Sequence, residues 1–314
     1  MAFKTRPLGE NFGLEILDAD IANIDDAGFE AIRDCWQQDP LLLIRRQNPT
    51  NEEFIDFSRR FGTLDIVLGG QDPDERYPEL LFISNLLKND GSVAGGLGNA
   101  ELVWHTDQIY REKPASGSIF YGVEMPNDVG HTSFCNMALA YDTLPEDRKA
   151  QVEGKRTSCR YGADNPLSSY MKNNLGKTYR RGLSEEQVKK VENRTPAVGH
   201  EMTLENPVTG QRTLYFSPNH TTEIEGLVEE DGRTLIDALL DHALQPQHIH
   251  THHWRNGDVI FWDNARLLHR RDKFPDTHPR YAKRTTIFLD PAHFAVPDPD
   301  RPYPELVQEY LRAS

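Results

Sequence analysis

Short apolar runs bounded by turn residues fill the second half of the chain, and they predict β-strands rather than long helices. The clearest runs are "SGSIFYGVEM" (116–125), "HTSFCNM" (131–137), "RTLYFS" (212–217), "GDVIFWD" (257–263) and "RTTIFLD" (284–290). Two stretches with helical periodicity interrupt them, around 138–153 and 232–245. Many short strands with a few helices outside them predict a β-sandwich or a jelly-roll barrel.

The first hundred residues alternate between helical and extended patterns. A short strand near residue 14, a helix that begins at the acidic "DDAG" and a buried strand in "LLLIRR" are expected in that order. A second helix should begin at Thr50 or Asn51 and end at Gly62. Its apolar face is made by Phe54, Phe57 and Phe61, which we expect in the core. The strand "ELLFISN" and the glycine-rich, mobile loop "KNDGSVAGGLGNAE" then lead into "VWHTDQIYRE".

Composition restricts the class of protein. The chain has 314 residues, of which 37% are hydrophobic and 27% charged, and no linker or repeat divides it, so we expect a single domain over residues 1–314. The formal net charge of −14 argues against nucleic acid and anionic membrane as partners. The three cysteines are far apart and should be reduced, and no signal peptide or spanning segment is visible, so a cytoplasmic protein is expected.

The candidate chemistry begins in "VWHTDQIYRE", where His105 and Asp107 stand two residues apart. On a strand their side chains would share a face with Cα atoms roughly 7 Å apart, close enough to meet on one metal ion. The alternative to a metal site is that the two are simply polar side chains on the solvent-exposed face of a strand. A third ligand is expected at His269, in an irregular segment after the strand 257–263. Two histidines and one carboxylate form the facial ligand set of non-haem Fe(II) oxygenases.

Further residues at fixed distances make the pattern specific. Thr132 stands 25 residues after Asp107, and Arg280 stands 11 residues after His269. In these four elements, and in "FSRRFG", "GDVIFWDNARLLHRRD" and "RYAKRTTI", the chain resembles the TauD/TfdA family of Fe(II)- and 2-oxoglutarate-dependent dioxygenases over nearly its whole length.

The resemblance implies a mostly β fold with flanking helices, the double-stranded β-helix or distorted jelly roll. It implies Fe(II) held by His105, Asp107 and His269, with 2-oxoglutarate and O2 as cosubstrates. Arg280 would bind the distal carboxylate of 2-oxoglutarate through its planar fork, and Thr132 would donate a further hydrogen bond. Family members are often dimers or tetramers, so a homo-oligomer is left open.

The expected reaction is hydroxylation of an unactivated C–H bond in a small anionic substrate, with release of succinate and CO2. In taurine-type members an arginine at the position of Arg284 grips the acidic group of the substrate, which here would be a carboxylate, a sulfonate or a sulfate. A structural ion pair is the alternative for Arg284. Desaturation and isonitrile-forming oxidation of an amino-acid derivative remain open, whereas Asp107 leaves no vacancy for the chloride of a halogenase.

The substrate pocket is only partly suggested by the sequence. Where taurine dioxygenase has a histidine after the "FG", this chain has Asp65 and Val67, which makes taurine doubtful. The segment 159–174 offers Arg160, Tyr161 and Lys172 as pocket-rim candidates, with a solvated loop as the alternative.

A second histidine cluster suggests a competing function. In "HIHTHH", residues His248, His250 and His252 would share one strand face and could bind zinc, as in a metal hydrolase or a metal-stabilised binding barrel. A solvated strand face is the favoured interpretation.

Overall fold

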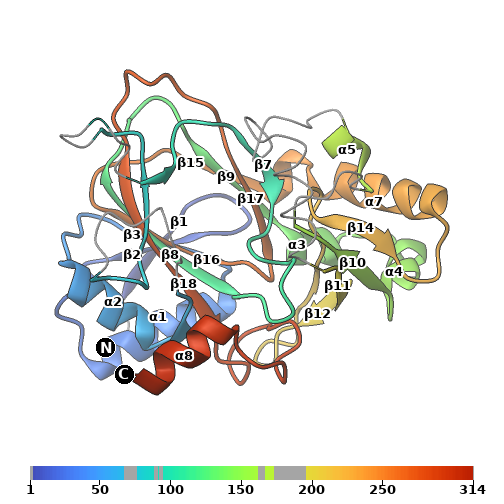
Figure 1. Ribbon diagram of the computed structural model, residues 1–314, viewed down its shortest axis with the longest axis horizontal. Helices are drawn as coiled ribbons and strands as arrows, with labels where there is room; N and C mark the ends of the chain where they lie inside the picture. The colour runs from blue at the N-terminus through green and yellow to red at the C-terminus, as the bar shows by residue number, and fades with distance from the viewer. Residues whose placement is uncertain are drawn as a thin grey trace.

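Two facing β-sheets form the centre of the molecule, which is seen here in a computed structural model that describes residues 3–66, 76–87, 91, 95–161, 167–172 and 196–313 (Figure 1). The large sheet has the order β1 (Lys4–Pro7), β2 (Leu14–Leu17), β3 (Leu41–Ile44), β16 (Asp258–Asp263), β8 (Gly117–Glu124), β18 (Tyr281–Leu289), β5 (Leu81–Ser84) and β6 (Gly96–Leu97), and β4 (Gly62–Leu64) also pairs with β18. The small sheet has the order β15 (Ile249–His252), β9 (Thr132–Asn136), β17 (Leu267–Arg271) and β7 (Leu102–His105).

The interior between the sheets is apolar and aromatic. Phe120 and Trp262 from the large sheet pack in one cluster with Phe134 and Leu267 from the small sheet. The rings of Phe134 and Trp262 lie 5.8 Å apart, which joins the two sheets directly. Burial of aromatic side chains on both inner faces is what holds such layers together. The predicted double-stranded β-helix is therefore confirmed.

Helices cover the outer faces of the sheets. On the large sheet lie α1 (Asp26–Gln38) and α2 (Asn51–Arg59), and Trp36 of α1 contacts Phe261 of β16 at 5.5 Å between ring centroids. A second apolar cluster joins the small sheet to α3 (Met137–Asp142) and α7 (Glu229–Ala243). The remaining elements are α4 (Glu146–Val152), α5 (Ser169–Lys172), α8 (Glu305–Ala313), the 3-10 helix η1 (Pro246–His248), and the strands β10 (Arg156–Cys159), β11 (Val198–Glu201), β12 (Thr203–Glu205), β13 (Arg212–Leu214) and β14 (Thr221–Ile224).

In Figure 1 the strands β10, β11, β14 and the helices α4, α5 and α7 lie on the side of the small sheet away from α1 and α2. Within the described ranges, no helix is long and apolar enough to cross a bilayer.

Several predicted elements occur where expected, and others differ. Helix α2 is capped by Thr50, whose hydroxyl accepts from the Glu53 amide at 3.2 Å while the Glu53 carboxylate accepts from the Thr50 amide at 2.8 Å. The strand that carries His105 is shorter than predicted, because it ends at that residue. The segment around His269, predicted to be irregular, is the strand β17. Helix α8 was not among the predicted elements. In the predicted glycine-rich loop, residues 88–90 and 92–94 lie outside the described residues, and Gly96–Leu97 form the short strand β6.

Gly62 is the first residue of β4, three residues after the end of α2 rather than at the helix end itself, and it lies at a point of close backbone contact. A Cβ atom at this residue would lie 2.1 Å from the carbonyl oxygen of Phe288, on the strand that pairs with β4. Its φ of 153° is also unfavourable for an L-residue. The glycine is therefore required for β4 to approach β18.

We predict that Gly62→Ala lowers the free energy of unfolding by roughly 3–4 kcal/mol, since the added methyl group forces the two backbones apart. Urea unfolding at equilibrium measures the change. Gly210→Ala is the matched control, because Gly210 has a φ of 69° but no atom within 4 Å of the added Cβ. The control should lose only about 1–2 kcal/mol, and equal losses in the two variants would contradict this account.

Candidate functional site

A cavity of about 240 Å³ lies between the two sheets, and residues from both sheets line it. Thr132 and His269 project from the small sheet, whereas Phe120, Trp262 and Arg284 project from the large one. The cavity therefore opens within the jelly roll itself.

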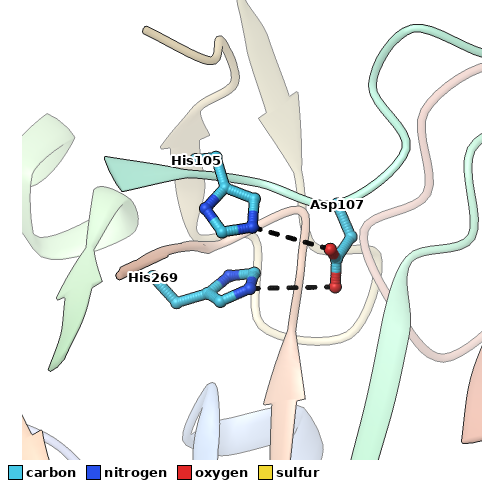
Figure 2. A group of neighbouring side chains, drawn as sticks. All are labelled: His105, Asp107 and His269. Carbon is cyan, nitrogen blue, oxygen red and sulfur yellow. Dashed lines mark ion pairs between the residues drawn. The ribbon is translucent and has the colours of Figure 1, made fainter. Parts of the chain in front are cut away.

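His105, Asp107 and His269 form a compact group at this cavity. Strands β7 and β17 pair so that His269 lies directly opposite His105, and the two imidazole rings are 4.1 Å apart. Figure 2 shows Asp107 facing both rings, with each Nε2 atom 3.8 Å from a carboxylate oxygen. The three potential ligand atoms lie within 4.8 Å of one another, and no other such group of three occurs among the described residues.

Asp107 reaches this position by a route that the sequence did not predict. It lies in a turn beyond the end of β7 rather than on the same strand face as His105. The next residue, Gln108, has a left-handed φ of 57°, and Thr106 donates to the carbonyl of Asn264 at 2.5 Å. The turn thus brings the carboxylate towards His269 from outside the strand.

The protonation states of the three side chains suit metal binding. Nδ1 of His105 lies 2.7 Å from the carbonyl of Val103, so it must donate and Nε2 keeps its lone pair. Burial lowers the pKa of His269 to about 3. Burial raises the pKa of Asp107, but the Arg284 guanidinium and the two imidazoles outweigh this and bring it to about 2. A neutral imidazole and an ionised carboxylate are the forms that coordinate a metal.

This donor set fits Fe(II). Two imidazole nitrogens and one carboxylate on one side of a common point leave other coordination positions free, which is the facial arrangement of non-haem iron oxygenases. A structural zinc site would instead be closed by four protein ligands. The residues present are those that a resident Fe(II) ion requires.

Two buried arginines also line the cavity. Arg280 is 1% exposed, and its guanidinium donates to the carbonyl of Gly130 at 2.9 Å. Arg271 is 4% exposed and donates to the carbonyls of Leu97 and Ala100 at 2.6 and 2.5 Å. Within the described part of the chain, no carboxylate oxygen lies within 4.0 Å of either guanidinium.

Burying the two positive charges of Arg280 and Arg271 costs free energy, and this cost indicates an anionic ligand. Burial, and secondly the charge of Arg271, lower the pKa of Arg280 well below its usual value. Burial alone lowers the pKa of Arg271 to about 10. Buried charges are normally paired, since an unpaired one loses its hydration without compensation. The arrangement therefore favours a bound carboxylate.

Thr132 and Arg280 both contact Trp254, and both line the cavity. The indole nitrogen of Trp254 donates to the Thr132 hydroxyl oxygen at 3.0 Å. Because an indole N–H can only donate, the hydroxyl proton of Thr132 remains free to donate to a ligand.

Arg284 lies close to the metal-binding group. It projects from β18, its guanidinium donates to Asp107 at 3.0 Å, and it lies 6.0 Å from the ring centroid of Trp262. It is also a wall of the cavity. The ion pair and the pocket position, which were alternatives from sequence, are thus both present.

The other predicted pocket residues have different outcomes. Tyr161 lines the cavity, whereas Arg160 is exposed and lines a different one. Asp65 is buried and accepts hydrogen bonds from Gln108 and Arg111 at 2.6 and 2.9 Å. Val67 and the side chain of Lys172 lie outside the described residues.

The sequence did not identify several residues that line the cavity. These are Tyr110, Asn219, His220, Trp254 and Arg271. Tyr110 lies three residues after Asp107, and this closeness in sequence to a predicted metal ligand could have marked it as a candidate lining residue. His220 comes from a distant loop and carries no local signal, yet its ring lies 4.9 Å from that of Tyr110.

The second histidine cluster is not a metal site and not a solvated face. His248 and His252 are buried, so the prediction of a solvated strand face was wrong for them. His248 hydrogen-bonds Thr143 at 3.1 Å, and His252 pairs with Asp258 at 2.9 Å. His250 packs edge-on against Phe12. Their roles are structural, because β15 lies against β9 and is covered by neighbouring segments.

Comparison with known proteins places the chain among dioxygenases. The model of the taurine catabolism dioxygenase TauD, TfdA family matches residues 4–286. The (S)-phenoxypropionate/alpha-ketoglutarate-dioxygenase of Sphingobium herbicidovorans is 31% identical over 93% of this chain and 96% of that protein. The pentalenolactone F synthase of Streptomyces avermitilis is 31% identical over 92% and 95% of the two chains.

Two further likenesses come from another curated relative and a solved structure. The alpha-ketoglutarate-dependent 2,4-dichlorophenoxyacetate dioxygenase of Cupriavidus pinatubonensis is 30% identical over 92% of this chain and 99% of that protein. The crystal structure of a taurine dioxygenase from Burkholderia xenovorans superposes with a TM-score of 0.71 at 25% identity, covering 92% of each chain.

The buried histidines of the site predict how stability depends on pH. Burial, and secondly the charge of His105, lower the pKa of His220 to about 3. Between pH 6.5 and 3 the unfolded chain therefore binds a proton at this residue that the folded chain does not. The stabilisation is complete above pH 6.5 and is lost as the pH falls.

We predict that His220→Gln makes the unfolding free energy of the metal-free protein less sensitive to acid. Between pH 7 and pH 5 the parent should lose roughly 2 kcal/mol more than the variant. Urea unfolding at a series of pH values measures both slopes, and identical slopes would show that His220 is protonated in the folded protein.

Proposed function

Because this chain belongs to the taurine catabolism dioxygenase TauD, TfdA family, we propose that the cavity between its two sheets is the active site. The protein is an Fe(II)- and 2-oxoglutarate-dependent dioxygenase. One observation carries the location of the site: the His105, Asp107 and His269 group shares a cavity with the buried Arg280, which has no carboxylate partner in the described part of the chain. A divalent cation would suit the first group, which contains an ionised carboxylate, and a dicarboxylate would balance the positive charge of Arg280.

We assign the metal to His105, Asp107 and His269. When bound, Fe(II) supplies the activation of O2 that no protein side chain can provide. The contribution of the protein is to hold three ligands in their binding protonation states inside a buried cavity. Arg284 steadies the Asp107 carboxylate through its 3.0 Å hydrogen bond, which supports a fixed ligand orientation.

We assign 2-oxoglutarate to the side of the cavity that carries Arg280 and Thr132. The guanidinium would bind the distal carboxylate through charge-assisted hydrogen bonds, and the Thr132 hydroxyl would donate one more. Phe120, Trp254 and Phe274 lie 5.7 Å from the guanidinium and restrict its orientation. Arg271 adds positive potential to the same region.

The reaction that this arrangement supports consumes 2-oxoglutarate and O2 and yields succinate, CO2 and a hydroxylated product. The primary substrate is a small anion, and we place its carboxylate, sulfonate or sulfate group at Arg284. Relatives named for phenoxypropionate and 2,4-dichlorophenoxyacetate support an acidic substrate. The net charge of −14 supports a small molecule rather than nucleic acid or a membrane surface as the partner.

Other assignments have less support. Desaturation would use the same cofactors and is the second candidate outcome. A zinc hydrolase built on His248, His250 and His252 is not supported, since two of these histidines are buried in structural hydrogen bonds.

We further infer one domain over residues 1–314, a cytoplasmic location and, as in many members of the family, a homo-oligomer.

We predict that Fe(II) and 2-oxoglutarate together give a weak visible charge-transfer band in the anaerobic parent protein, and that His269→Ala abolishes both the band and succinate release. Loss of one facial ligand removes the bidentate complex without disturbing core packing. His250→Ala is the matched control, because it removes a histidine of the other cluster and should retain the band. A band that persists in His269→Ala, or disappears in His250→Ala, would refute the assignment.

We predict that Arg280→Gln and Arg284→Gln affect different ligands. Arg280→Gln should weaken 2-oxoglutarate binding by roughly 30- to 1000-fold, since a charge-assisted pair is lost. Arg284→Gln should leave that affinity within a few-fold but raise the KM of the primary substrate and increase uncoupled 2-oxoglutarate turnover. Calorimetry and succinate assays measure the two effects. A larger loss of 2-oxoglutarate affinity in Arg284→Gln would reverse the assignments.

A further inference from the structure

We propose that a second cavity, beyond Tyr110 and Tyr161, receives an apolar tail of the primary substrate, so that this enzyme acts on amphiphilic anions. The proposal rests on the proposed function, because it extends the same active site outward. The second cavity has a volume of about 680 Å³, and Tyr110 and Tyr161 line both it and the cavity that holds His105, Asp107 and His269. Their rings lie 4.7 Å apart and form the shared wall.

The size of the inner cavity requires such an extension. Its volume of about 240 Å³ equals that of roughly eight water molecules. Ligand cavities usually measure about 300–1,000 Å³ for a single small molecule. With 2-oxoglutarate bound, the inner cavity would have room only for the reacting end of the primary substrate. The second cavity, which shares Tyr110 and Tyr161 with the first, would then take the rest of that substrate.

The lining of the second cavity is suited to an uncharged group. Its cations are already engaged: Arg111 donates to Asp65 at 2.9 Å, and Lys113 donates to the carbonyl of Pro299 and lies 5.2 Å from the ring centroid of Tyr303. The other described lining residues are mainly apolar or aromatic, namely Tyr110, Tyr161, Pro196, Val198, Pro302, Tyr303 and Pro304.

Two carboxylates also line this cavity. Glu112 and Glu305 are both exposed, and they would repel a second anionic group. The acidic head of the substrate therefore points inward to Arg284, and its tail points outward.

The backbone that carries Tyr110 is tied to the segment that forms the outer wall. The buried His200 imidazole hydrogen-bonds the carbonyl of Ile109 at 2.8 Å through Nε2 and the carboxylate of Asp298 at 2.6 Å through Nδ1. Through His200, the segment that carries Tyr110 is hydrogen-bonded to the segment that leads to Tyr303. This supports a built cavity rather than an incidental gap between loops.

The test is a binding series of straight-chain carboxylates, from propanoate to decanoate, titrated calorimetrically into the protein loaded with Mn(II) and 2-oxoglutarate. Glu305→Trp should fill the outer cavity from the start of α8. Glu309→Trp is the matched control, since it makes the same change in charge and size one helical turn away, at an exposed residue outside the cavity lining. Val198→Asp is a second variant, which places a carboxylate in the apolar wall.

In the parent and in Glu309→Trp, affinity should rise about three- to four-fold per methylene group through decanoate. In Glu305→Trp and Val198→Asp, propanoate should bind as in the parent, whereas decanoate should bind at least about ten-fold more weakly. Decanoate affinity that is unchanged or higher in both variants would overturn the proposal, as would a parent whose affinity stops rising at short chains.

Failure of the inference can be told apart from failure of the proposed function. If the parent gives the Fe(II) and 2-oxoglutarate band but binds no carboxylate of any length, the tail cavity is refuted and the dioxygenase site stands. If the band itself is missing, the active-site assignment fails and the inference fails with it.

Discussion

The burial of Arg280 without a carboxylate partner among the described residues is the constraint on which the proposed active site depends. Its guanidinium is enclosed by three aromatic rings. Among the described residues, it donates a hydrogen bond to the carbonyl oxygen of Gly130. Gly130 permits this approach, because a Cβ atom there would lie 2.8 Å from Phe274 and 3.3 Å from the guanidinium. The fold thus holds a cation in a place where only a bound anion can offset the loss of hydration.

The cavity is lined by two groups that would bind ligands of opposite charge. Asp107 is ionised and His269 is neutral, so the first group can accept a divalent cation. Arg280 and Arg271 are cationic, and we propose that they bind a carboxylate. A 2-oxo acid with a distal carboxylate would satisfy both groups, since one part could chelate a metal while the other paired with the arginines. Burial between two rigid sheets strengthens both interactions by excluding water.

The sequence predicted most of this site because its parts lie on regular elements or at fixed spacings. Short apolar runs bounded by turn residues predicted the strands, and the spacing of His105, Asp107, Thr132, His269 and Arg280 carried the family resemblance that implied the chemistry. The details that failed depend on tertiary contacts. Asp107 lies in a turn because Gln108 takes a left-handed conformation, and His248 and His252 are buried through hydrogen bonds to Thr143 and Asp258, which the run of histidines does not specify. His220 meets Tyr110 from a loop distant in sequence, so no local pattern marks it.

The most direct test compares the binding of 2-oxoglutarate with that of 2-oxopentanoate, which has the same chelating head but no distal carboxylate, to the Mn(II)-loaded protein by calorimetry. If Arg280 and Arg271 require an anion, 2-oxopentanoate should bind roughly 100-fold more weakly or worse, because the charge-assisted hydrogen bonds are lost. Equal affinities for the two acids would contradict this account, since the buried arginines would then contribute nothing to cosubstrate binding.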